Sequence, residues 1–149
     1  MKDRLRDTVE TYYGFNYNEN RVCINPKVLV IYKHGRNYGP NFFEISMSKY
    51  KDGKLYGNLH WWIVGGGYFG GAYVGNAEEG FDNENELIYH YLLKLERDLD
   101  QSIKNSKTEE FDDNGNIVSC TTKIRELKHF LGKVGEYKDL YNPKQLTLF

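Results

Sequence analysis

Two neighbouring segments alternate between apolar and polar side chains. Residues 43–48 follow this pattern, and residues 55–63 repeat it further along the chain. A period of two is typical of strands that bury one face. A three-residue loop with Gly53 in the left-handed conformation would set Phe43 opposite Trp61 and keep the apolar faces together, whereas a two-residue turn would pair apolar with polar positions. The sequence therefore predicts a bulged three-residue hairpin.

Two further strands are predicted on either side of this hairpin. Residues 28–32 form a short apolar, β-branched run after Pro26, which is typical of a buried strand. Glycines 65–67 are expected to break the second strand of the hairpin, and residues 68–74 favour another strand. The simplest arrangement is a meander of about four antiparallel strands.

The helical signals lie in the second half of the chain and at its start. Residues 83–104 combine Asn83 and Glu86, spaced like a capping box, with an apolar stripe of helical period. A second helix is predicted over 122–134, ended by two glycines, and a short one over 2–13. The stripe of the first helix consists of Ile88, Tyr91, Leu92, Leu95 and Leu99.

Strands followed by helices predict the α+β class. A chain of 149 residues fits one domain, and no internal repeat divides it. Pro143 discourages helix at Asn142, so an extended segment is expected to follow. We therefore predict a single α+β domain over residues 1–142 and an extended C-terminal segment over 143–149.

The charge is balanced overall but uneven along the chain. The formal net charge is −1, yet residues 78–113 hold twelve Asp or Glu against four Lys or Arg. The sequence lacks the strong excess of Lys and Arg that is typical of nucleic-acid-binding domains. The acidic region is interpreted as the solvated face of the long helix and its trailing loop; a surface that mimics DNA is the alternative.

The chain start and the cysteines point to the cytoplasm. The first six residues are mostly charged and no apolar run follows them, so neither a signal peptide nor a membrane span is predicted. Cys23 and Cys120 are far apart and share no metal-binding spacing. Two free thiols are expected, with a single disulfide as the alternative.

No catalytic residues, metal ligands or cofactor are predicted. Residues 65–70 satisfy G-x-G-x-x-G literally, but the residues after them favour a strand, whereas a dinucleotide site needs a helix N-terminus there. The acidic run at 110–115 lacks the glutamate that ends a calcium loop. The histidines share no metal-like spacing: they are His34, His60, His90 and His129.

Tyrosines beside lysines or arginines suggest a nucleic-acid surface. On one sheet face, tyrosine rings could stack on unpaired bases while the cations follow the phosphate backbone. The simpler interpretation is that the tyrosines half-cover a sheet and the lysines are solvated. The residues concerned are Tyr32, Lys33, Arg36, Tyr38, Lys49, Tyr50, Lys51 and Tyr56.

The last five residues are Gln145-Leu146-Thr147-Leu148-Phe149. They resemble the peptide by which bacterial polymerases, repair proteins and many phage or plasmid proteins dock on the DNA sliding clamp, the DNA polymerase III beta subunit. Four positions match that pattern, and Thr147 occupies the tolerant middle position, where Ser or Asp is more usual. The resemblance covers these five residues alone and implies the clamp as a protein partner.

This resemblance implies a non-enzymatic adaptor or modulator at DNA. Leu148 and Phe149 would be the main anchors, Leu146 a secondary apolar contact and Gln145 the polar contact. The tyrosine- and asparagine-rich body also looks like that of accessory proteins of phages and conjugative elements. The alternatives are that these apolar residues pack on the protein's own core, that the sheet binds single-stranded nucleic acid, or that the body is a small enzyme. The sequence indicates no oligomeric state.

Overall fold

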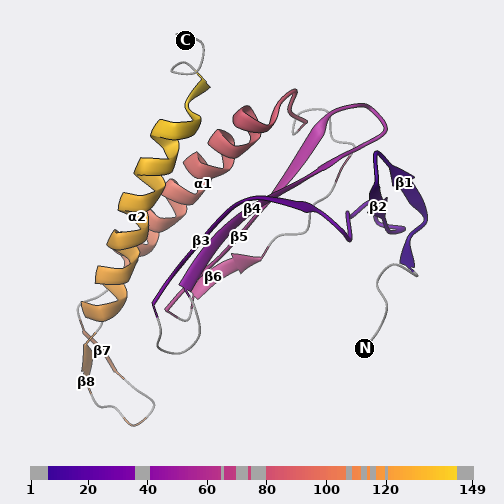
Figure 1. The fold of residues 1–149 in the computed structure, drawn as a ribbon. Coiled ribbons are helices and arrows are strands. Elements are labelled where there is room, and N and C mark those ends of the chain that lie inside the picture. The colour runs from indigo at the N-terminus through magenta and orange to yellow at the C-terminus, as the bar shows by residue number, and fades with distance from the viewer. Residues whose placement is uncertain are drawn as a thin grey trace.

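The computed structural model describes residues 7–35, 41–64, 66–69, 74, 80–106, 109–111, 114, 117–119 and 121–143. These residues form one larger antiparallel sheet, two long helices and two small hairpins, arranged as Figure 1 shows. The strands of the larger sheet all precede the two helices in the chain. The α+β class predicted from the sequence is therefore confirmed.

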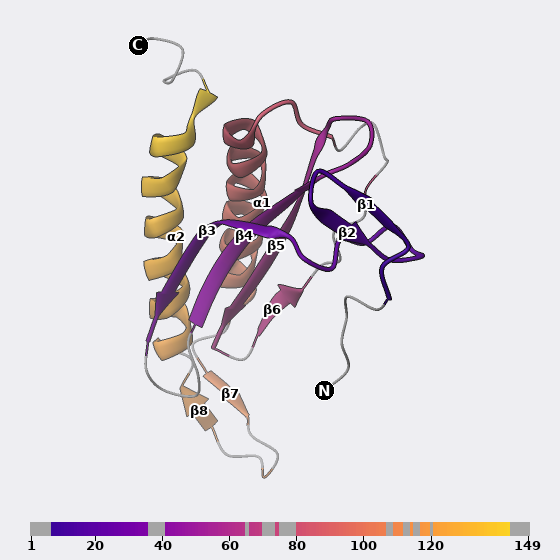
Figure 2. The same ribbon diagram turned by 45° about the vertical axis from the view of Figure 1, so that its right-hand side comes forward.

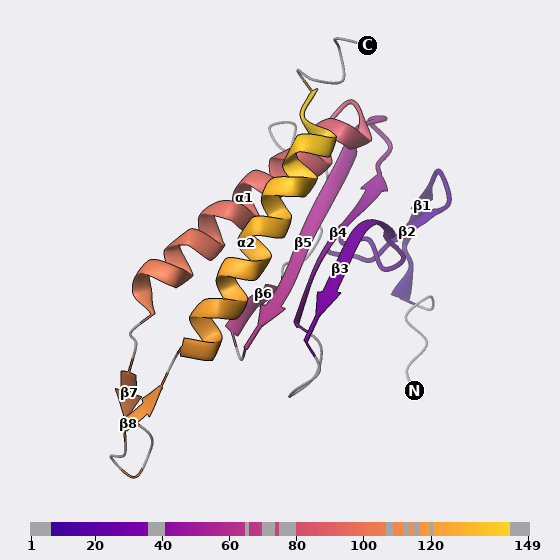
Figure 3. The ribbon, with the colours of Figure 1, turned by 60° about the vertical axis from the view of Figure 1, so that its left-hand side comes forward.

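The larger sheet is a meander of four strands, each paired antiparallel with its neighbour in the chain. Both helices lie on one face of this sheet, and they run alongside each other (Figures 1, 2 and 3). The strands, in their order across the sheet, are β3 (Lys27–His34), β4 (Asn41–Lys49), β5 (Leu55–Ile63) and β6 (Gly66–Phe69).

The hairpin of β4 and β5 has the predicted register. Phe43 pairs with Trp61, so the apolar residues of both strands lie on the face that the helices cover. The backbone N–H of Tyr50 donates to the carbonyl oxygen of Lys54 at 3.1 Å, which closes a loop of three residues. Gly53 has a φ of 77°, the left-handed conformation that this loop requires.

Helix α1 (Glu84–Asn105) begins where the sequence predicts. The side chain of Asn83 accepts a hydrogen bond from the backbone N–H of Glu86 at 2.9 Å and so caps the first turn. The predicted apolar stripe faces the sheet, with Tyr91 half-buried at its edge. The buried residues of α1 are Leu87, Ile88, Leu92, Leu95 and Leu99.

Helix α2 (Thr121–Tyr141) is longer than predicted. It continues through Gly132 and Gly135, which were expected to end it. Phe130 and Val134 are fully buried, and Tyr137 packs beside them on the same core, so tertiary packing outweighs the weak helix propensity of two glycines. Among the described residues, neither helix has an apolar stretch that could cross a membrane.

The helix predicted over residues 2–13 is wrong in its described part. Residues 10–12 form β1 (Glu10–Tyr12), which pairs with β2 (Phe15–Tyr17); residues 2–6 lie outside the described part of the chain. Tyr13 and Gly14 both have positive φ, 55° and 84°, as the tight turn of a two-residue hairpin requires. Helical spacing over so few residues could not outweigh this turn.

Two predicted strands differ in detail from the structure. Among the described residues β3 lies at the edge of the sheet. It is not a buried strand, because Val28 and Ile31 are each 47% exposed and, within the predicted segment 28–32, only Val30 is buried. Strand β5 does end just before the glycines, at Ile63, with a turn at Val64, which has a φ of 46°. The next strand, predicted over 68–74, already begins at Gly66, so Gly66 and Gly67 belong to β6; residues 70–73 lie outside the described part of the chain. Pairing with β5 offsets the poor strand propensity of glycine.

The link between the two helices contains a hairpin that the sequence did not reveal. β7 (Glu109–Phe111) pairs with β8 (Ile117–Ser119). Figures 1, 2 and 3 show this hairpin at the end of the molecule where α1 finishes and α2 begins. The far end of α2 therefore lies at the opposite end of the molecule.

The described residues bury two apolar clusters. The larger lies between the sheet and the helices and includes residues of β3, β4, β5, α1 and α2. The smaller lies where the β1–β2 hairpin meets the start of β5. Its members are Tyr17, Cys23, Tyr50, Tyr56 and Val74.

Candidate functional site

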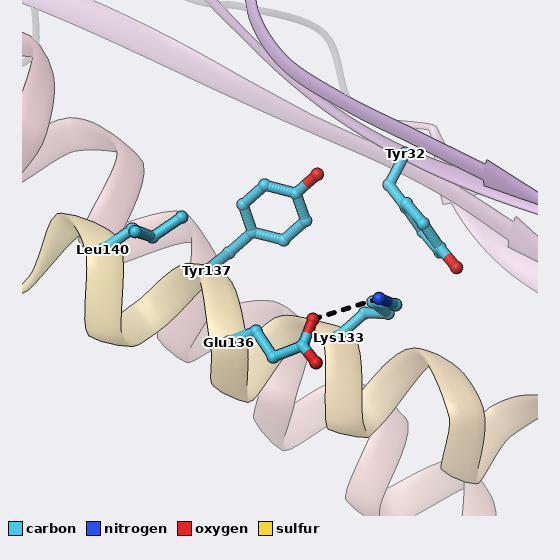
Figure 4. Close-up of a pocket in the computed structure, with 5 residues that line it drawn as sticks. All are labelled: Tyr32, Lys133, Glu136, Tyr137 and Leu140. Carbon is cyan, nitrogen blue, oxygen red and sulfur yellow. Dashed lines mark ion pairs between the residues drawn. The ribbon is translucent and has the colours of Figure 1, made fainter.

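A groove separates helix α2 from the edge strand β3. Tyr32 projects into it from β3 and Tyr137 from α2, with ring centres 6.4 Å apart and planes tilted by 62° (Figure 4). Lys133, Glu136 and Leu140 complete the lining of a cavity of about 220 Å³. The groove therefore joins two aromatic rings, one apolar side chain and one ion pair.

A cluster of polar rings adjoins this groove near the end of β3. The rings of His34 and His129 stack with centres 3.8 Å apart. Nδ1 of His34 lies 2.6 Å from a carboxylate oxygen of Glu126, and Nε2 of His129 shares a hydrogen bond of 2.7 Å with the hydroxyl of Tyr32. These contacts connect β3 to the first half of α2 and continue into the groove through Tyr32.

The electrostatics of the cluster follow from these contacts. Burial would raise the pKa of Glu126, but hydrogen bonds from His34 and Asn41 and the charges of both histidines outweigh burial and lower it. For Tyr32, burial raises the pKa, and nearby Lys133 offsets only part of that effect. Glu126 therefore stays a carboxylate and Tyr32 a neutral phenol around neutral pH.

The contact between Glu126 and His34 is of a kind that can transfer protons. A carboxylate that holds Nδ1 of an imidazole leaves Nε2 to accept or donate a proton. The side chain of His34 is 43% exposed, so solvent reaches it. The two imidazoles stack face to face and do not converge on one point, and the described residues contain no group of three His, Cys, Asp or Glu arranged to hold a metal.

Sequence reasoning did not find this cluster. His34 and Glu126 are 92 residues apart, and Tyr32 and His129 are 97 apart. No motif spacing links positions so distant. A weak signal was present, because each of the two elements has a histidine close to an aromatic residue: Tyr32 precedes His34 by two positions, and Phe130 follows His129 directly.

The structure does not bring the predicted nucleic-acid residues to one exposed face. Tyr50 and Tyr56 are 3% and 1% exposed and belong to the smaller core cluster, and Tyr32 faces the groove beside α2, far from both. Arg36 and Tyr38 fall outside the described residues. The expectation of exposed tyrosines on one face is therefore wrong for Tyr50 and Tyr56, because the hairpin β1–β2 covers them, whereas Tyr32 is half-buried and lines the groove beside α2.

The lysines of that prediction are also dispersed. Lys33 lies on the helix-free face of β3, opposite Phe42 of β4. Lys49 lies 4.4 Å from the ring centre of Tyr13, and Lys51 lies 5.5 Å from that of Tyr50, both near the loop of the β4–β5 hairpin. Cations at opposite ends of the sheet cannot follow one short stretch of backbone, so this hypothesis receives no geometric support.

The cysteines, the glycine-rich motif and His60 were also considered as sites in the sequence, and their described residues have structural roles. Cys23 is a buried free thiol, as expected, and Cys120 lies outside the described residues. Residues 66–69 of the glycine-rich motif form strand β6. The ring of His60 shares a hydrogen bond of 2.6 Å with the amide of Asn58.

The five residues that resemble a clamp-docking peptide, Gln145 to Phe149, lie outside the described part of the chain. The described part ends at Pro143, and residues 141–143 are half-buried. No family model, curated protein or solved structure matches this chain. Function must therefore be inferred from the residues themselves.

Proposed function

We propose that this protein is an adaptor or modulator of DNA replication that docks on the sliding clamp through residues 145–149. The observation that carries the proposal is the sequence Gln-Leu-Thr-Leu-Phe directly after a folded body. Helix α2 ends at Tyr141, at the end of the molecule opposite the β7–β8 hairpin (Figures 1 and 2). A peptide that follows this position can reach a partner without unfolding the α+β body.

The residue types suit a groove on another protein. Burying a leucine or phenylalanine side chain contributes roughly 1.5–3 kcal/mol, so Leu148 and Phe149 would supply most of the binding free energy. Leu146 would add a further apolar contact. The amide of Gln145 both donates and accepts hydrogen bonds, which would fix the direction of the peptide.

The body is proposed to be a non-enzymatic, cytoplasmic module, encoded by a mobile element such as a phage or conjugative element. Sheet and helices share one continuous core, which makes the body a compact carrier for a short docking peptide. A short peptide that becomes ordered only on binding loses conformational entropy, so its affinity should be modest and its exchange fast. Rapid exchange suits a modulator that must leave the clamp to other partners.

The proposal is tested by titrating the purified DNA polymerase III beta subunit with the full chain, using calorimetry. We expect saturable binding that is lost in a chain truncated after Lys144 and weakened at least tenfold in a Leu148→Ala, Phe149→Ala double variant. The control is Val9→Ala, because Val9 is also apolar and 62% exposed but belongs to the opposite end of the sequence. Absence of binding by the intact chain would refute the proposal.

A further inference from the structure

The groove between α2 and β3 contains apolar surface that the body itself does not cover. Leu140 is 64% exposed although it lines the same cavity as the rings of Tyr32 and Tyr137 (Figure 4). Tyr137 and Leu140 belong to the last turns of α2, and Tyr32 lies further back along the groove, beside Lys133 (Figure 4). An exposed leucine beside two aromatic rings is a suitable contact for an apolar peptide.

The remaining chain has the length to reach this groove. Leu140 lies three residues before Pro143 and Lys133 lies ten before it, which corresponds to about 5 Å and 15 Å along a helix. Residues 144–149 can span up to about 20 Å when extended. A peptide that turned back at Pro143 would therefore cover the groove from Leu140 to Lys133.

The chemistry of the two surfaces is complementary. Three apolar side chains of the last five residues would meet Tyr32, Tyr137 and Leu140. The glutamine amide can bond to the ion pair of Lys133 and Glu136, whose charged atoms are 3.1 Å apart at the rim. Within the described residues, β3 pairs on one side only, with β4, so its outer edge also offers backbone groups to an extended peptide.

We propose that residues 145–149 dock in the α2–β3 groove of their own chain when no clamp is bound. The regulatory part rests on the proposed function: the groove and the clamp compete for the same apolar side chains. A peptide held in the groove for three-quarters of the time would bind the clamp about fourfold more weakly than a free peptide. The groove would thus restrict clamp binding to high clamp concentrations.

The docking itself is tested without the clamp. Amide spectra by nuclear magnetic resonance are compared between the full chain and its Leu148→Ala, Phe149→Ala variant. We expect shifts at Tyr32, Lys133 and Tyr137, which are far in sequence from the substituted residues. Shifts confined to residues that follow Leu140 would overturn the proposal.

The competition is tested with a substitution in the groove. Leu140→Glu places a charge at an exposed position, so folding should be kept, and far-ultraviolet circular dichroism checks this. We expect this variant to bind the clamp about threefold or more tightly than the unsubstituted chain and as tightly as a synthetic peptide of residues 144–149. Val9→Glu, an equally exposed position on the β1–β2 side of the molecule, should leave the affinity unchanged.

The outcomes separate the two proposals. If the synthetic peptide does not bind the clamp, the proposed function fails, while the spectra still decide whether the groove holds the chain end. If the peptide and the unsubstituted chain bind the clamp equally well, and Leu140→Glu changes nothing, the groove does not compete and the inference fails while the proposed function stands.

Discussion

At the scale of single residues, Gly57 decides how closely helix α1 approaches the sheet. A Cβ atom at this position would lie 2.4 Å from the ring of Tyr91 and 2.8 Å from the side chain of Leu87, both on α1. The hydroxyl of Tyr91 donates to the carbonyl oxygen of Gly57 at 2.9 Å. The absence of a side chain therefore lets the helix lie directly on β5.

We expect Gly57→Ala to lower the free energy of unfolding by about 1–3 kcal/mol, because the helix must move away or the ring must leave its position. The control is Gly132→Ala in α2, where an added Cβ meets nothing within 4 Å. This change should raise the free energy of unfolding by about 0.5–1 kcal/mol, because alanine favours helix. Urea unfolding of both variants measures the difference; equal effects would contradict the close approach.

At the scale of elements, the side chain of Glu126 fastens helix α2 to the edge strand β3. Its carboxylate accepts hydrogen bonds from His34 and Asn41, which come from neighbouring strands of the sheet. The lowered pKa of Glu126 means that the folded protein binds this proton less readily than the unfolded chain does. The contribution to stability is therefore present at neutral pH and is lost as the pH falls through the folded-state pKa.

We expect Glu126→Gln to be less stable than the unsubstituted chain by about 1.5–3 kcal/mol at pH 7, the usual range for hydrogen bonds to a charged group. The difference should shrink as the pH falls below 4.5, the ordinary value for this carboxyl, because the unsubstituted side chain then becomes protonated as well. Unfolding curves between pH 3 and pH 7 check this. Parallel curves for the two proteins would show that the carboxylate charge does not hold α2.

The elements also show how far sequence reasoning extends. Helix α1 was predictable because its cap and its apolar stripe are local signals that agree with the final packing. The length of α2 was not, because Tyr137 and Tyr141, beyond the predicted end, pack on the larger core cluster, and that contact stabilises helix on both sides of Gly135. Hairpin β1–β2 depends on positive φ at Tyr13, a conformation that side-chain periodicity cannot reveal.

At the scale of the whole molecule, the smaller core cluster attaches the β1–β2 hairpin to the sheet. Burial raises the pKa of Tyr17 from 10.0 to about 12, and it also raises the pKa of the Cys23 thiol. The hydroxyl of Tyr17 donates to the carbonyl oxygen of Lys49 at the end of β4. Two groups that must remain protonated therefore lie at the contact between the hairpin and the sheet.

We expect the protein to lose stability in alkaline solution, on the order of 2 kcal/mol between pH 9 and pH 12. The sign follows from the raised pKa of Tyr17: its contribution is complete below pH 10 and is lost as the pH rises through about 12, because the unfolded chain gives up this proton first. Urea unfolding at pH 8 and pH 11.5 measures the loss.

The matched variant for this prediction is Tyr17→Phe. It should cost about 1 kcal/mol at neutral pH, through the lost hydrogen bond to Lys49, yet lose less stability between pH 8 and pH 11.5 than the unsubstituted chain. An identical alkaline loss in both proteins would assign the effect to other groups.

The sequence alone determined the α+β class, the register of the β4–β5 hairpin and the start of α1, because turn conformation, strand alternation and helix capping act over a few neighbouring residues. It also contains the peptide on which the proposed function rests. Only the tertiary structure decided which tyrosines are covered, how far α2 extends, and that His34, Glu126 and Tyr137 line one continuous region between α2 and β3. Those features depend on contacts between residues from 32 to 97 positions apart, which local patterns along a chain do not encode.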